Sequence, residues 1–223
     1  LIPYFGGTDI AKLDLAAVTR FDAWRTQQSG KVPAQSTINN HNSALNRVLD
    51  LAELNGWTVK SLRPTLLNKG VKTQSRGSFS VEEYRTIYSA LRSFHKQTPN
   101  EKSAATRETL RNYVLFLANT GVRHGTEALG LKWRNIEWYE RDSERYLAIN
   151  VDGKTNKRTA IARDSVENFL WRQAQLNPRM MADNFDALIA AKLDEPVFTT
   201  RLGATVTVHN LNRAFNALLD ELD

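Results

Sequence analysis

Hydrophobic residues recur at helical spacing over most of the chain, with polar and charged residues between them. Gly30, Gly56 and Gly121 each follow such a segment, where a helix is expected to end. Ser80 and Glu83 form a capping-box pattern at the start of another segment. The pattern predicts helices over residues 15–28, 36–55, 80–96, 104–120, 164–176 and 208–222, with a further short helix opening near Thr126.

One region departs from this helical pattern. Residues 146–151 are rich in strand-forming side chains, Asp152-Gly153 is a turn signal, and residues 158–161 form a returning strand. The predicted fold is therefore mainly α with a small antiparallel β-hairpin or sheet, and the second half of the chain is of the α+β type.

A polar, basic stretch divides the chain. Residues 68–77 contain Lys69, Lys72 and Arg76 and no acidic residue, which is typical of a linker. We predict a helical domain over residues 1–67, a linker over 68–79 and a second domain over 80–223. The first residue is not Met and the last lie within a helical pattern, so we expect both domains to be incomplete.

The composition favours a polyanionic partner without proving one. The chain has 30 Lys and Arg against 24 Asp and Glu, a net charge of +6. Cysteine is absent, which excludes disulfides and thiolate metal sites. No apolar run approaches the roughly 20 residues that span a bilayer, and no signal peptide is recognisable. We expect a cytoplasmic protein without a metal or cofactor.

The helix predicted over residues 36–55 has an unusual polar face. Its first turns carry amides, hydroxyls and one arginine, with no acid before Asp50. Such side chains contact phosphates and base edges in nucleic-acid grooves, although a merely solvated face would have a similar composition. The candidate DNA-binding residues here are Asn39, Asn40, Ser43 and Arg47, together with Lys69, Lys72 and Arg76 of the linker. His41 has no second ligand at metal-binding spacing.

The most informative stretch is residues 113–133. An apolar run over residues 113–118 predicts a buried helix that ends at Gly121, and Arg123 follows in the bend before the next helix. A guanidinium keeps its charge at neutral pH, so an oxyanion is expected near it. That oxyanion could be a structural carboxylate such as Glu127 or the phosphate of a ligand.

A family resemblance favours the phosphate. The sequence Thr120-Gly121-x-Arg123, followed by Glu127-Ala128-Leu129-x-Leu131-x-Trp133, resembles the first arginine box of the tyrosine recombinases, the phage-integrase family. The resemblance implies that Arg123 clamps the scissile phosphate of DNA. Glu127 lies four residues after the arginine instead of the usual three, as a one-residue insertion in the bend would produce. Ser36-Thr37-Ile38-Asn39 and the residues after it resemble the family's core-binding domain, so a two-domain DNA clamp is expected.

The same resemblance assigns a lysine on the hairpin. In the family, a lysine of a Lys-Thr pair donates a proton to the leaving 5′ oxygen. Lys154-Thr155 matches that pair, and Lys157 is the alternative candidate. His209 and Arg213 resemble the second box, His-x-Leu-Arg, but the arginine falls one place late. We therefore interpret both as ordinary helix residues.

The rest of the family's machinery has no counterpart in these 223 residues. The second arginine, the histidine and the tyrosine that forms a 3′-phosphotyrosyl link are expected beyond Asp223, and the chain alone should not cleave DNA. None of its tyrosines has the sequence context of that nucleophile: Tyr4, Tyr84, Tyr88, Tyr113, Tyr139 and Tyr146.

The resemblance implies a site-specific recombinase that integrates or excises a phage or other mobile element. Family members act on duplex DNA sites as tetramers, so we expect a monomer in solution, a homo-tetramer on DNA and a place at the bacterial nucleoid. The alternative is a non-catalytic DNA-binding protein with a degenerate recombinase fold. In a third interpretation, the basic faces are only solvated and DNA is not the partner.

Overall fold

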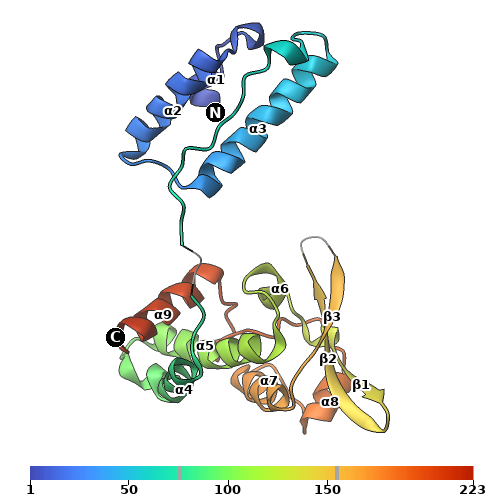
Figure 1. Ribbon diagram of the computed structural model, residues 1–223. Coiled ribbons are helices and arrows are strands. Elements are labelled where there is room, and N and C mark those ends of the chain that lie inside the picture. The colour runs from blue at the N-terminus through green and yellow to red at the C-terminus, as the bar shows by residue number, and fades with distance from the viewer. Residues whose placement is uncertain (75–76, 154–155, 223) are drawn as a thin grey trace. The chain divides into compact units, whose positions relative to one another are not determined.

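The computed structural model describes residues 1–74, 77–153 and 156–222, so the predicted site residues Arg76 and Lys154 lie outside the described residues. The chain divides into two compact units, Leu1–Ser78 and Phe79–Asp223 (Figure 1). Most of the regular structure is helical, and one small antiparallel sheet lies in the second unit. This confirms the mainly α class with a small antiparallel sheet.

The first unit is built on two long helices. It contains α1 (Ile2–Phe5), α2 (Leu15–Ser29) and α3 (Gln35–Leu54), with 3₁₀ helices at Ile10–Lys12 and Lys60–Leu62. Its buried cluster consists of Leu13, Val18, Leu45 and Leu49. Val48, an apolar residue of α3, is 50% exposed. The stripe formed by the buried residues of α3 is narrow, and Val48 lies beside it.

The first unit extends beyond the boundary predicted at residue 67. Val71 accepts a hydrogen bond from the backbone N–H of Gln35 at 2.9 Å and donates its own to the Pro33 carbonyl at 3.0 Å. The Asn68 side chain donates to the Gln35 carbonyl at 2.9 Å. The start of the predicted linker is therefore bonded to the N-terminal end of α3.

The second unit combines helices with a three-stranded sheet. Its helices are α4 (Val81–Ala90), α5 (Glu101–Thr120), α6 (Thr126–Leu129), α7 (Ser165–Leu176), α8 (Phe185–Ala190) and α9 (Val208–Asp220), with 3₁₀ helices at Phe94–Gln97 and Trp133–Asn135. Strands β1 (Ile136–Arg141), β2 (Glu144–Asp152) and β3 (Lys157–Ile161) pair antiparallel in that order. The sequence pattern missed β1 and α8. It also predicted the end of α4 at residue 96 instead of Ala90, and the start of α5 at residue 104 instead of Glu101.

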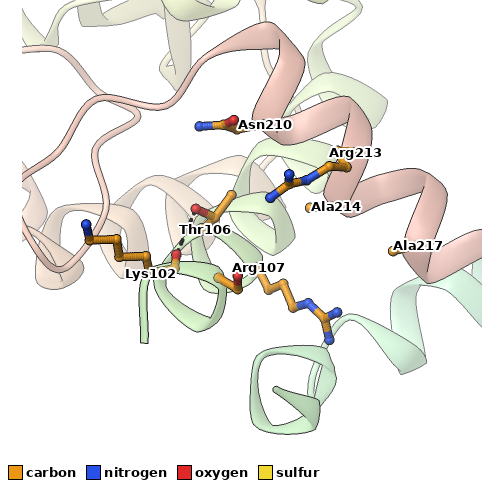
Figure 2. Close-up of a pocket in the computed structure, with 8 residues that line it drawn as sticks. Lys102, Thr106, Arg107, Asn210, Arg213, Ala214 and Ala217 are labelled. Atoms are coloured by element: carbon orange, nitrogen blue, oxygen red, sulfur yellow. Dashed lines mark hydrogen bonds between the residues drawn. The ribbon is translucent and has the colours of Figure 1, made fainter. Parts of the chain in front are cut away.

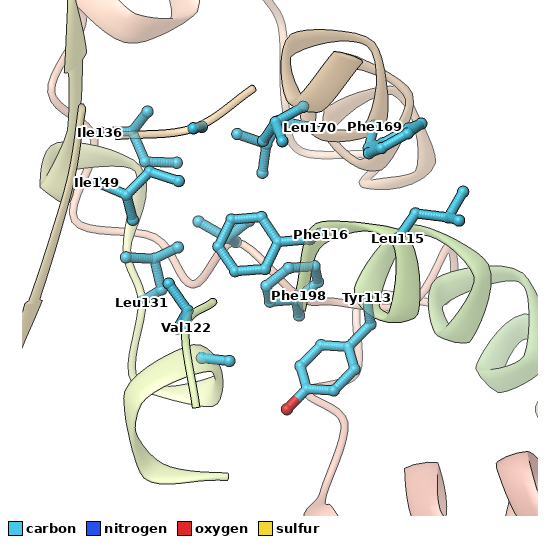
Figure 3. Packing of buried hydrophobic residues seen from close by; sticks show 14 of the residues in the cluster. Tyr113, Leu115, Phe116, Val122, Leu131, Ile136, Ile149, Phe169, Leu170 and Phe198 are labelled. Atoms are coloured by element: carbon cyan, nitrogen blue, oxygen red, sulfur yellow. The ribbon is translucent and has the colours of Figure 1, made fainter. Parts of the chain in front are cut away.

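Helix α5 runs through the core of the second unit. Tyr113 and Phe116 of α5 pack edge-on against Phe198, with ring centroids 4.9 and 5.2 Å apart (Figure 3). Ile136 of β1 and Ile149 of β2 are directly paired, and both are fully buried. The core therefore joins α5 to one face of the sheet.

The end of α5 is defined by backbone geometry. Gly121 has φ +65°, in the left-handed region, and its N–H bonds to the Leu117 carbonyl at 3.1 Å. Val122, directly after it, is buried. The chain is thus held by a cap on one side and a buried side chain on the other, just before Arg123.

We expect Gly121→Ala to lower the free energy of unfolding by about 1 kcal/mol, because a Cβ strains a residue in the left-handed region. The added Cβ would meet no atom within 4 Å, so crowding does not contribute. Urea denaturation followed by circular dichroism measures the change. Gly121→Asn is the control and should lose less, since Asn tolerates this conformation; equal losses in both variants would contradict the explanation.

Candidate functional site

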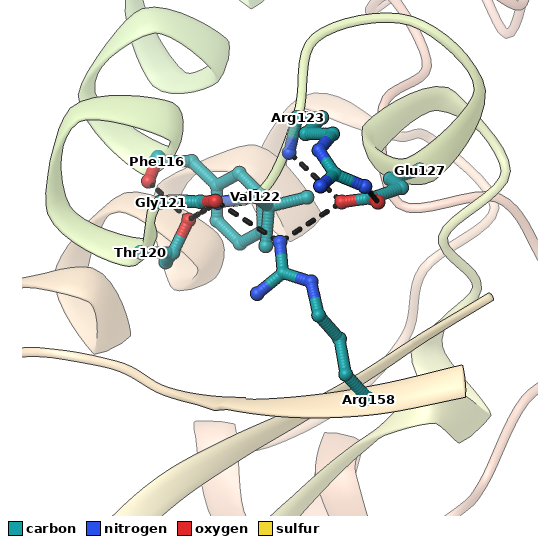
Figure 4. A network of polar contacts seen from close by, with 7 residues as sticks. All are labelled: Phe116, Thr120, Gly121, Val122, Arg123, Glu127 and Arg158. Atoms are coloured by element: carbon teal, nitrogen blue, oxygen red, sulfur yellow. Dashed lines mark hydrogen bonds and ion pairs between the residues drawn. The ribbon is translucent and has the colours of Figure 1, made fainter. Parts of the chain in front are cut away.

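Arg123 and Glu127 form a two-point contact across the bend between α5 and α6. The backbone N–H of Arg123 donates to Glu127 Oε2 at 3.0 Å, and its Nη1 donates to Oε1 at 3.0 Å (Figure 4). The Arg123 side chain nevertheless remains 70% exposed. The structural carboxylate expected for Arg123 is therefore Glu127, yet the guanidinium keeps further N–H donors open to solvent.

Glu127 accepts bonds from a second arginine. Arg158 Nη2 lies 3.0 Å from Glu127 Oε2 and donates to the Gly121 carbonyl at 3.0 Å (Figure 4). One carboxylate with a 4% exposed side chain thereby joins the end of α5, helix α6 and strand β3. The Arg123 N–H bond, and then the Arg158 guanidinium, hold the pKa of Glu127 below its ordinary value.

Arg158 is a member of this site that the sequence interpretation did not assign. It pairs with Val151 in the sheet register, on the same face as the buried Ala160. Neighbouring strand residues alternate between faces, so Arg158 points toward the core side, where α6 lies. Strand alternation alone would have predicted that Arg158 faces the core side. The family resemblance, however, assigned a role only to the lysines of the hairpin.

The bend between Arg123 and Glu127 has an unusual backbone conformation at Gly125. Its φ of +92° is a conformation that side-chain-bearing residues rarely adopt. The buried Tyr113 hydroxyl accepts the Gly125 N–H at 3.2 Å and lies 2.8 Å from His124 Nδ1. The longer spacing therefore does not prevent Glu127 from reaching Arg123.

The turn of the hairpin between β2 and β3 also lies close to this site. A Cβ added to Gly153 would lie 3.0 Å from Glu127 Oε1 and 2.8 Å from the Asn156 carbonyl oxygen. Only glycine fits this close approach without a shift of its neighbours. Lys154, the candidate proton donor, lies outside the described residues.

Lys157, the alternative donor, is not brought to Arg123. Its side chain is 85% exposed, and its Nζ lies 3.9 Å from Asp152 on the neighbouring strand. Strand alternation places Lys157 on the opposite face of β3 from Arg158. In this geometry it belongs to the solvated side of the hairpin.

The amide-rich face of α3 is partly used within the protein. Asn39 Oδ1 accepts from Asn68 Nδ2 at 2.7 Å, and Asn46 Oδ1 accepts from Arg63 Nη2 at 2.9 Å. These bonds attach the segment after α3 to the helix. The remaining candidates on α3 are exposed, and no hydrogen bond of their side chains is found among the described residues: Asn40, Ser43 and Arg47.

The basic residues that follow α3 are solvent-accessible where described. Lys69 and Lys72 are exposed, and Arg76 lies outside the described ranges. On α9, His209 and Arg213 are exposed, whereas Leu211 and Leu218 face the core. Within the described part of the chain, no three His, Asp or Glu side chains are grouped so that they could hold a metal ion.

No protein-family model, curated protein or solved structure matches this chain. The case for a function therefore rests on the residues and their geometry. Among the described residues, no helix is long and apolar enough to cross a membrane.

We expect Glu127→Gln to destabilise the protein at neutral pH, because the two guanidiniums lose their shared anion. The folded-state pKa of Glu127 is lowered, so its contribution is present above the ordinary glutamate pKa and is lost as the pH falls through the lowered value. Thermal unfolding across an acid-to-neutral series measures this. Glu140→Gln, at an exposed position on β1, is the control. If Glu127→Gln and wild type differ in thermal stability by the same amount at every pH, the charge of Glu127 is not the cause of the difference.

Proposed function

We propose that this chain binds duplex DNA and contributes the phosphate clamp of a tyrosine-recombinase type of strand breakage and rejoining. The observation that carries the proposal is the Arg123–Glu127–Arg158 network, which fixes an exposed guanidinium beside a buried carboxylate. The Arg123 side chain is 70% exposed in this ion pair, so its guanidinium can also contact a phosphate.

The clamp would act through charge. In phosphoryl transfer, negative charge on the phosphate oxygens must be stabilised while one oxygen attacks phosphorus and the leaving oxygen departs from the opposite side. A pre-oriented guanidinium does this without reorganising during the reaction. Glu127 fixes the position of Arg123, and Arg158 brings a second positive charge to the same carboxylate. Attack by a tyrosine and proton donation by Lys154 follow only from the family resemblance.

The first unit would supply DNA affinity. Asn40, Ser43 and Arg47 are exposed on successive turns of α3, and Lys69 and Lys72 add charge after it. Amide and hydroxyl groups suit base edges and sugars, and the cations suit phosphates. With Arg123 in the second unit, these residues would let the two units hold one duplex as a clamp.

We expect the 223-residue chain to bind duplex DNA. If it contacts six or more phosphates, its affinity should fall by about 10³-fold between roughly 50 and 200 mM salt. Fluorescence anisotropy with a labelled duplex measures the affinity at each salt concentration. Arg47→Gln should flatten the slope of log K against log salt by about 1.

The matched control is Arg20→Gln, because Arg20 is an exposed arginine on α2 of the same unit and has no assigned DNA contact. Its slope should equal that of wild type. Absent or salt-insensitive binding by the wild-type chain would overturn the DNA assignment.

In a polypeptide that joins this chain to a second arginine box and a tyrosine, Arg123→Lys should reduce cleavage by about 10²-fold or more, since a lysine cannot reproduce the fixed guanidinium geometry. DNA affinity should fall by less than about tenfold, because one phosphate contact among many is altered. The assay is the covalent protein–DNA adduct formed on a nicked duplex.

The reading frame past the codon for Asp223 shows whether such a polypeptide is the natural one. A second box and a tyrosine there would support the enzyme. A stop codon in place of them would support the non-catalytic DNA-binding protein. An Arg123→Lys protein that still forms the adduct at the wild-type rate would refute the clamp.

A further inference from the structure

A second cationic site lies on the second unit, away from Arg123. A pocket of about 200 Å³ opens between α5 and α9 (Figure 2). Helix α5 contributes Lys102, Ser103, Thr106 and Arg107, and α9 contributes Asn210, Arg213, Ala214 and Ala217. In Figure 2 the Arg213 guanidinium is directed from α9 toward Thr106. The rest of the lining is small or polar, so the pocket combines open space with three cationic residues, Lys102, Arg107 and Arg213.

The pocket contains no carboxylate. No ion pair of Lys102, Arg107 or Arg213 is found within the described ranges. Glu101 and Glu108, which adjoin Lys102 and Arg107 in the sequence, instead bind Arg201, at 3.1 and 3.3 Å. Lys102, Arg107 and Arg213 give the lining of the pocket three positive charges and no negative one, which favours an anion there.

One of the cations is held in place by an aromatic ring. The Arg107 guanidinium lies 3.9 Å from the centroid of the Phe94 ring, and Nη1 donates to the Phe94 carbonyl at 3.2 Å. This orientation restricts the side chain while leaving its other N–H donors available. A pre-oriented arginine loses less conformational entropy when it binds an oxyanion.

The helix ends add to the same positive field. Lys102 lies in the first turn of α5, whose N-cap is Asn100, and Asn210 lies in the first turn of α9, whose N-cap is Thr207. A helix N-terminus attracts anions, and a lysine there is unfavourable for helix stability alone. Glu101 supplies the acid of this first turn, and Lys102 adds a cation beside the pocket.

We propose that this pocket binds a phosphate of the DNA backbone. The inference rests on the proposed function and adds a second phosphate contact to it. The α5 residues that line the pocket lie 13 to 18 residues before Thr120, the end of the helix, and Arg123 follows just after it. At about 1.5 Å per residue this is roughly 20 to 27 Å along the helix axis, less than one turn of duplex DNA but more than the spacing of neighbouring phosphates. The pocket would therefore anchor the backbone at a distance from the scissile phosphate.

The variants that test the pocket are Arg213→Gln and Lys102→Gln, since both side chains are exposed and neither holds the core. Each should weaken DNA binding by about tenfold at low salt, as loss of a charge-assisted hydrogen bond does. Each should also flatten the salt slope by about 1, with the same effect on every duplex sequence. Arg179→Gln, at another exposed arginine of this unit, is the control and should change neither.

An inorganic probe separates the pocket from the DNA assignment. Titration with sodium phosphate, followed by the backbone amide signals of α5 and α9, should shift them in wild type and not in Arg213→Gln. Phosphate binding at the pocket by a protein that binds no DNA would overturn the DNA assignment and the proposed function together. If both variants keep the wild-type slope of log K against log salt, and phosphate shifts no amide signal of α5 or α9, the pocket does not bind phosphate. The proposed role of Arg123 would still be decided by its own cleavage assay.

Discussion

The geometry of the second unit depends on one buried carboxylate. Glu127 accepts three hydrogen bonds from two arginines, and these come from the end of α5 and from β3. Burying an anion is unfavourable unless its bonds are satisfied, so the carboxylate is stable only when both arginines are in place. The same bonds restrain Arg123 and Arg158. A loop, a short helix and a strand are thereby fixed relative to one another by a single side chain.

The core beneath this network keeps it rigid. Val122 is buried directly before Arg123, and Leu131 and Trp133 are buried directly after α6. Bends that carry functional groups are commonly mobile, but this one is pinned at both ends by close-packed side chains. A guanidinium on such a bend is positioned before any ligand arrives, which is the condition for effective electrostatic stabilisation of a phosphate.

The sequence was sufficient for the existence of the longer helices and for the cap at Gly121, because periodicity and capping are local properties. It was not sufficient for contacts between distant segments. Arg158 reaches Glu127 only through the strand register, and the two residues are far apart in the chain. Likewise, composition favoured Asn39 as a DNA contact, and only the fold shows that its side-chain oxygen accepts a hydrogen bond from Asn68. Residue type predicted what these side chains can bind, but only the tertiary structure decides which groups they meet.

The two units differ greatly in how much apolar surface each encloses. The first relies on a cluster of Leu13, Val18, Leu45 and Leu49, whereas the core of the second runs from Ile87 to Leu218. Opening α2 and α3 therefore exposes less hydrophobic area than opening α5, and their amides should exchange with solvent before those of α5. A ligand that engages α3 would stabilise the weaker unit most, so part of its binding energy would be spent on suppressing local unfolding. The DNA affinity measured on this chain would then depend on how stably α3 is folded before binding, as well as on the contacts that α3 makes.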